Sequence, residues 1–163
     1  MSFEHPSAEH PESVWDYPRP PAVVATDEHV VVRHAGVVIV DTSRALRVLE
    51  TSHPPSYYLP VADFLPGVIR PVSGNTLCEF KGTASYGDLV VGDDRIERAV
   101  WWYEKPWGDY AVLRGYVALY PGLVDECTVD GEVVQIQEGD FYGGWITSRV
   151  KGPFKGGPGT LGW

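Results

Sequence analysis

Short runs of apolar and β-branched residues recur along most of the chain, and turns separate them. Ala35-Gly36 lies between runs at 29–33 and 37–40, and Asp130-Gly131 is the dipeptide most typical of a two-residue hairpin turn. Further strands are predicted at 44–50, 56–59, 76–81, 86–91, 95–103, 116–120, 123–129 and 132–137, with one helical turn within 61–69. This series of short strands, without a long amphipathic helix, predicts an all-β domain.

Both ends of the chain depart from this strand pattern. We expect residues 1–13 to form a flexible arm, while residues 14–138 make the β domain, including an aromatic arm that begins at Val14-Trp15. Residues 139–163 alternate Gly and Pro with Phe, Tyr and Trp, whereas a flexible linker would be rich in Gly and Ser without aromatic residues. The sequence therefore predicts that 139–163 is an ordered wrap on the same domain.

Composition narrows the classes of function. The chain has 163 residues and a net charge of −9, which disfavours a nucleic-acid partner because phosphate contacts need Lys and Arg. No apolar run is long enough for a transmembrane helix, so we expect no membrane partner. Two cysteines and the absence of a signal-peptide pattern favour a cytoplasmic protein.

Several segments together resemble a known but uncharacterised family. These segments are 14–21, 45–60, 78–82, 100–103 with Pro106, 139–148 and 152–163. They are similar to the family catalogued as domain of unknown function 427. The resemblance implies a β-tent-like fold, in which two small antiparallel sheets meet at an angle. Many relatives of that fold hold a structural zinc on two Cys-x-x-Cys motifs, but this sequence has none, so we expect no metal and no cofactor. A nucleotidyltransferase label also attached to the family finds no matching motif in the sequence.

Glu50 is the first candidate for chemistry. Alternation along 44–50 places it on the same face as Leu46 and Val48. A carboxylate on an apolar face is costly unless it is paired, and burial raises its pKa, as a general acid or base requires. The alternative is a structural ion pair with Arg47, Arg33 or Lys81.

Cys78 and Lys81 form the second candidate. A nearby ammonium stabilises a thiolate and makes the thiol nucleophilic. Residues three apart point to opposite faces of a regular strand, so the pair meets only if a bulge or turn near Gly82 redirects Lys81. The alternative is a small buried cysteine beside a surface lysine. Cys127 follows Asp125 and Glu126, whose negative charges raise a thiol pKa, so it is expected to be inert.

Aromatic residues form the third candidate group. On the strand at 95–103, alternation sends Trp102 to one face and Tyr103 to the other. One set is expected in the core, and the other can line a pocket and stack on a flat or cationic ligand. We assign Tyr57, Trp102 and Tyr103 to ligand binding, although sheet cover is the simpler role for all of them. His53, in the turn before two prolines, is a candidate proton shuttle or a solvated turn residue.

Together these patterns favour a protein that binds a small molecule in a pocket. As a metal-independent enzyme it would use Glu50, Cys78, Lys81 and Tyr58 in catalysis. Arg47, His53, Tyr57, Trp102 and Tyr103 would contact the ligand. The alternative is a non-enzymatic module that binds a ligand or a protein, with the aromatic arms serving stability or a homodimer contact.

Overall fold

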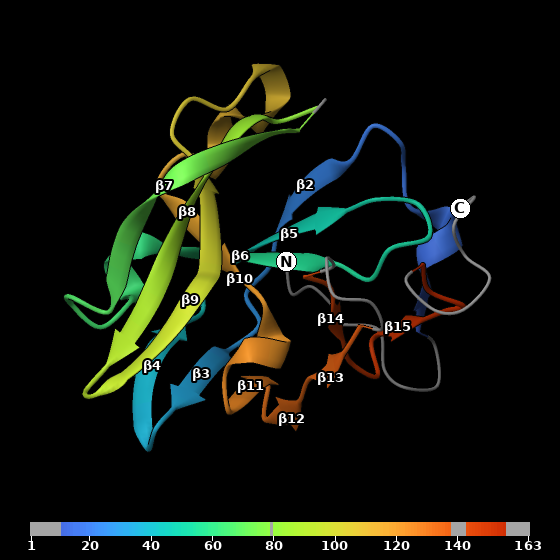
Figure 1. Ribbon diagram of the computed structural model, residues 1–163. Coiled ribbons are helices and arrows are strands. Elements are labelled where there is room, and N and C mark those ends of the chain that lie inside the picture. The colour runs from blue at the N-terminus through green and yellow to red at the C-terminus, as the bar shows by residue number, and fades with distance from the viewer. Residues whose placement is uncertain (1–10, 79, 138–142, 156–163) are drawn as a thin grey trace.

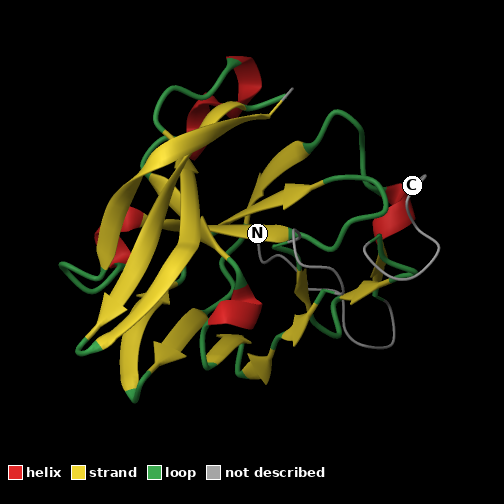
Figure 2. Cartoon of the chain, viewed as in Figure 1, coloured by secondary structure: helices red, strands yellow, loops and turns green. Residues whose placement is uncertain are grey.

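The fold is built almost entirely from antiparallel strands, which confirms the predicted all-β class. The computed structural model describes residues 11–78, 80–137 and 143–155. Figure 2 shows that the helical segments are short turns in the connections between strands. These turns are η1 (Val14–Asp16), η2 (Val61–Asp63), η3 (Gly108–Leu113) and η4 (Pro121–Leu123). The helical turn predicted within 61–69 is η2.

The larger sheet has seven strands, and each of its neighbouring pairs is antiparallel. Its order is β2 (Ala22–Ala25), β5 (Leu46–Leu49), β6 (Ser56–Pro60), β10 (Tyr116–Leu119), β9 (Asp94–Tyr103), β8 (Gly82–Val91) and β7 (Ile69–Cys78). In Figure 1, β7, β8 and β9 run steeply on the left, while β5 and β6 extend sideways. The sheet therefore changes direction strongly along its width.

The smaller sheet has four strands and packs on the larger one. Its order is β12 (Glu132–Val133), β11 (Glu126–Val129), β3 (Val30–His34) and β4 (Val37–Thr42). The Asp130-Gly131 turn that joins β11 to β12 has positive φ at both residues, as a type I′ hairpin requires. Val32 of β3 and Leu59 of β6 are both completely buried in the core that the two sheets share. One face of the seven-stranded sheet is thereby used for the core, and its other face carries a separate cluster of buried side chains.

Segments near both ends of the chain lie side by side. Strand β1 (Glu12–Ser13) pairs in parallel with β15 (Val150–Lys151). A second small ladder joins β13 (Gln135–Ile136) to β14 (Trp145–Ile146). Trp145 is completely buried, and Val14 and Val150 share a small apolar cluster. The parts of the predicted arm and wrap at 1–10, 138–142 and 156–163 lie outside the described residues.

The strand predicted at 76–81 differs from the observed one. Strand β7 begins earlier, at Ile69, and ends at Cys78, and the chain has reversed into β8 by Gly82. Gly82 has φ of +111°, a conformation that side-chain-bearing residues rarely adopt. Lys81 therefore lies in a turn and not on a strand. A turn near Gly82 is the feature that the sequence predicts to be necessary for contact between Lys81 and Cys78.

Candidate functional site

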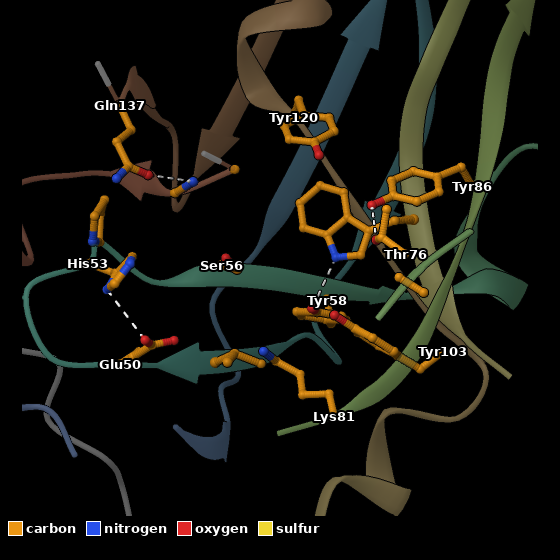
Figure 3. Close-up of a pocket in the computed structure, with 16 residues that line it drawn as sticks. Glu50, His53, Ser56, Tyr58, Thr76, Lys81, Tyr86, Tyr103, Tyr120 and Gln137 are labelled. Atoms are coloured by element: carbon orange, nitrogen blue, oxygen red, sulfur yellow. Dashed lines mark hydrogen bonds and ion pairs between the residues drawn. The ribbon is translucent and has the colours of Figure 1, made fainter. Parts of the chain in front are cut away.

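A cavity of about 230 Å³ opens on the face of the seven-stranded sheet that points away from the shared core. Figure 3 shows Glu50 and His53 on one side of it, with Gln137 above His53, and Tyr58, Tyr103 and Lys81 on the other side. The cavity is lined by Val48, Glu50, His53, Pro54, Ser56, Tyr58, Thr76, Lys81, Ala84, Tyr86, Trp101, Tyr103, Tyr120, Gln137, Gly143 and Gly144. Side chains on strands β5 to β9 thus form much of its wall. The rest comes from the connections after β5, β7 and β10 and from the segment after β13.

Strand register explains why these side chains meet. Ala118 of β10 stands opposite Tyr58 of β6 on one side and opposite Trp101 of β9 on the other. Directly opposed residues in a sheet point to the same face, so the two large aromatic residues flank a small one. The methyl group of Ala118, which is completely buried, leaves space between the two rings.

The aromatic wall is tied together by direct contacts. Trp101 Nε1 donates a hydrogen bond to Tyr58 Oη at 3.1 Å, and the two rings meet edge to face. Tyr103 stacks beside Tyr58 with ring centroids 6.4 Å apart, and the ring centroids of Tyr120 and Trp101 are 4.5 Å apart. Burial raises the pKa of Tyr58 and Tyr103 well above the usual tyrosine range, so both hydroxyls are neutral hydrogen-bonding groups.

Glu50 supplies a carboxylate at the edge of the cavity, directly after β5. Its side chain is 25% exposed, and Oε2 lies 3.5 Å from Arg19 Nη2 and 3.9 Å from His53 Nδ1. His53 Nδ1 also lies 2.8 Å from the Thr51 carbonyl oxygen. The structural ion pair that Glu50 forms is with Arg19, from the N-terminal arm, and not with Arg47.

Cys78 and Lys81 meet across the turn between β7 and β8. Lys81 Nζ donates to Cys78 Sγ at 3.6 Å, and the Tyr103 hydroxyl hydrogen-bonds both Cys78 and Tyr58. Burial alone would raise the pKa of the Cys78 thiol. The charge of Lys81 and hydrogen bonds from the backbone N–H groups of Phe80 and Lys81 outweigh burial, so the pKa of Cys78 is lowered.

Lys81 itself is only 9% exposed. Among the described residues, no carboxylate forms a salt bridge with Lys81. Its ammonium group contacts Cys78 Sγ and lies 6.0 Å from the centroid of the Tyr103 ring. A buried ammonium is costly without a partner of opposite charge. Lys81 is therefore suited to hold either a thiolate or an electron-rich oxygen of a ligand.

The segment after β13 closes one side of the cavity. Gln137 is 3% exposed; its Oε1 accepts from Gly144 N at 3.0 Å and its Nε2 donates to the Lys155 carbonyl at 2.6 Å. A Cβ atom on Gly143 would stand 2.3 Å from the Trp101 ring, and one on Gly144 would stand 2.4 Å from Pro54. The two glycines are required here because the backbone lies directly against neighbouring side chains.

The structure brings together five of the nine residues singled out in the sequence. Glu50, His53, Tyr58, Lys81 and Tyr103 line one cavity. Cys78 contacts Lys81 and Tyr103 beside the cavity but is not one of the residues that line it. The catalytic and ligand-binding roles assigned to all of them stay predictions.

The other three lie elsewhere. Arg47 and Tyr57 are on the opposite face of β5 and β6, where Arg47 is 1% exposed and pairs with Glu12 and Glu28. Their orientation follows from alternation, because Val48 and Tyr58 point to the cavity. Trp102 lines a more open hollow of about 640 Å³, while its neighbour Trp101 reaches the cavity.

Several lining residues were missed by the sequence reasoning. Ser56 and Tyr86 share the face of Tyr58 and Trp101 by alternation and register, so they could have been found once the strand order was known. Gln137, Gly143 and Gly144 carried no such signal, because the connection after β13 follows no strand period. No group of three or more His, Cys, Asp or Glu in the described part of the chain is arranged to hold a metal ion.

The sequence profile of one protein family matches residues 22–130, about two thirds of the chain. That family is described as a domain of unknown function, DUF427. The chain belongs to this family. No curated protein matches the chain at a significant level.

The DUF427 match includes the strands that carry the aromatic wall, Glu50, Cys78 and Lys81. Gln137, Gly143 and Gly144 lie beyond its last matched residue. In this DUF427 chain, the cavity is therefore completed by a segment outside the matched region. No helix in the described ranges is long and apolar enough to cross a membrane.

Proposed function

We propose that this protein binds a small, flat, polar molecule in the cavity and acts on it without a metal, with Glu50 as the acid–base group. The observation that carries the proposal is the presence of a carboxylate, Glu50, and a nearly buried ammonium, Lys81, in one aromatic-walled cavity. Aromatic faces favour flat ligands, and a few convergent polar groups fix their orientation.

The chemistry of the lining defines the ligand further. The Lys81 ammonium donates to a carbonyl or anionic oxygen, and the Glu50 carboxylate accepts from an N–H or O–H group. Because His53 Nδ1 lies 3.9 Å from Glu50 Oε2, beyond direct hydrogen-bond distance, His53 relays a proton between that carboxylate and solvent through one bridging water. The cavity volume of about 230 Å³ is below the usual range for drug-sized ligands, which favours a molecule built on a single ring.

A second candidate function is binding without chemistry. Cys78 is not among the lining residues, because Lys81 and Tyr103 stand at the cavity wall in its place. A ligand held by Lys81 and Glu50 therefore does not have to touch the thiol. The position of Cys78 behind the cavity wall is therefore compatible with a module that holds its ligand without a reaction at the thiol.

Ligand-observed NMR with a set of single-ring fragments tests the proposal. The set contains neutral, cationic and anionic members, and the blocking variant is Ser56→Trp, which fills the cavity from β6. Fragments are expected to bind the wild type and to lose binding in Ser56→Trp. The control is Glu126→Gln, on β11 of the smaller sheet, where Glu126 forms an exposed ion pair with Arg33. Equal binding to the wild type and to a folded Ser56→Trp variant would refute the proposal.

The two candidate functions differ in what happens after binding. In an enzyme, bound fragments are consumed over hours, and Glu50→Gln keeps binding but stops their consumption. In a binding module, the spectra of bound fragments stay constant in the wild type. A wild type that consumes fragments at the same rate as Glu50→Gln would remove Glu50 from the acid–base role.

A further inference from the structure

The turn between β7 and β8 holds a thiol and an amine in reactive proximity. Lys81 Nζ lies 3.6 Å from Cys78 Sγ. The turn is braced from outside, because Trp107 N donates to the Lys81 carbonyl at 3.0 Å and the Trp107 ring lies close against Gly82. The two side chains are therefore held together by the fold and do not depend on a bound ligand for their contact.

The thiol has the environment of an oxidisable cysteine. Cys78 is half-buried, so a molecule as small as a peroxide can reach it, and several hydrogen-bond donors surround its sulfur. Thiolate character and access are the two properties that decide which cysteines react with peroxide.

The chain offers no second thiol at this place. Cys127 lies on β11 in the core between the two sheets, whereas Cys78 packs in the cluster on the opposite face of the larger sheet. Cys127 is 3% exposed, and burial raises its pKa to about 12. An oxidised Cys78 consequently meets the Lys81 amine and not a thiol.

We propose that Cys78 is a peroxide-sensitive modification site that closes a covalent sulfur–nitrogen link to Lys81. The Cys78 thiolate attacks one peroxide oxygen, the O–O bond breaks, and the Lys81 ammonium gives its proton to the departing hydroxide. The products are a sulfenic acid, water and a neutral Lys81 amine. The amine nitrogen then attacks the sulfenic sulfur, a second water leaves, and a sulfenamide remains. Sulfur loses two electrons, peroxide is reduced to water, and Lys81 serves first as proton donor and then as nucleophile.

The link changes the cavity as well as the thiol. Lys81 loses its positive charge and its Nζ is drawn onto Cys78, so the cavity loses its nearly buried cation. This consequence rests on the proposed function: oxidation switches off binding of ligands that Lys81 holds. Reduction by a small thiol opens the sulfur–nitrogen bond and restores the cavity.

Mass spectrometry of the full chain tests the link directly. Reduced protein is treated with hydrogen peroxide, free thiols are blocked, and the intact and trypsin-digested masses are measured. The expected product lacks two hydrogens relative to the reduced protein, resists trypsin after Lys81, and returns to the starting mass with dithiothreitol. The Cys127→Ser variant should behave like the wild type, because Cys127 takes no part.

The Lys81→Arg variant separates the two roles of the lysine. It keeps a cation beside Cys78 but removes the nucleophilic amine, so a sulfenic acid should accumulate, react with dimedone and proceed to sulfinic acid. Loss of two hydrogens in Lys81→Arg as in the wild type would show that another nitrogen forms the link. Formation of sulfinic acid alone in the wild type would overturn the proposal outright.

Fragment binding tests the consequence separately. Fragments that bind the reduced wild type should bind the linked protein at least about tenfold more weakly, with recovery after reduction. Unchanged binding by the linked protein would overturn the switch while leaving the link in place. If no fragment binds the reduced protein, the proposed function fails, and the mass measurement still decides whether the link forms.

Discussion

Removing the charge of Glu28 should destabilise the protein more than any exposed ion pair can. Glu28 is 3% exposed and lies at the centre of a buried network. Its Oε1 is 2.7 Å from Arg149 Nη1 and 3.9 Å from Arg47 Nε, and Glu12 lies 2.9 Å from Arg47 Nη2. Two arginines and two glutamates therefore balance in charge, and Tyr57 Oη donates to Glu28 at 2.9 Å.

The magnitude follows from these distances. At an effective dielectric constant of about 20, the attractions of Glu28 to Arg149 and Arg47 are about 6 and about 4 kcal/mol. Desolvation of the buried carboxylate offsets several kcal/mol of this gain. Glu28→Gln keeps an acceptor oxygen but leaves the arginines with one carboxylate, so we expect the free energy of unfolding to fall by about 3–5 kcal/mol.

Urea denaturation followed by tryptophan fluorescence measures this free energy, and the melting temperature should fall by roughly 10 °C. The matched control is Glu126→Gln, whose ion pair with Arg33 has side chains 40% and 48% exposed and should contribute less than about 1 kcal/mol. The double variant Glu28→Gln/Arg149→Gln restores the charge balance and should recover more than half of the loss. A cost for Glu28→Gln no larger than that for Glu126→Gln would refute the reasoning.

Three further outcomes can be measured. Burial of Glu12 opposes ionisation, but hydrogen bonds and charges from neighbouring groups leave its pKa below the ordinary 4.5. The stabilisation that the ionised Glu12 provides is therefore complete above pH 4.5 and is lost as the pH falls through the folded-state pKa. Glu12→Gln should consequently flatten the acid side of a plot of unfolding free energy against pH. A thiol probe should label Cys78 in the folded protein below the usual thiol pKa of about 8.5, whereas Cys127 should stay unlabelled until denaturant is added. Deleting 139–163 removes the completely buried Trp145, and the melting temperature should fall clearly; an unchanged value would show that this segment contributes nothing to the fold.

Much of the β architecture was present in the hydrophobic pattern. The hairpin at Asp130-Gly131 formed because its turn residues accept positive φ, which is a local property. Alternation along β9 correctly separated Trp102 from Tyr103, since successive side chains on a strand point to opposite faces. The same rule places Arg47 on the opposite face of β5 from Val48, so alternation by itself separates Arg47 from a cavity on the Val48 face.

Strand alternation does not say which face of a sheet is covered. The four-stranded sheet covers the face that carries Trp102 and Leu59, which leaves Trp101 to face the cavity. Strand order is equally non-local: β6 pairs with β10, more than fifty residues away in sequence, and that pairing places Tyr58 beside Trp101. Neither fact has a signature within a short window of residues.

The sequence by itself determined the strand class, the two faces of each strand, and a cysteine and a lysine three residues apart. Tertiary structure decided that a turn ending at Gly82 joins that pair, and that Gly143 and Gln137 close the cavity. The physical reason is the separation along the chain of the residues that determine each feature. Side-chain alternation and turn conformation depend on neighbouring residues, whereas the cavity depends on which distant strands pair and on which face the second sheet removes from water.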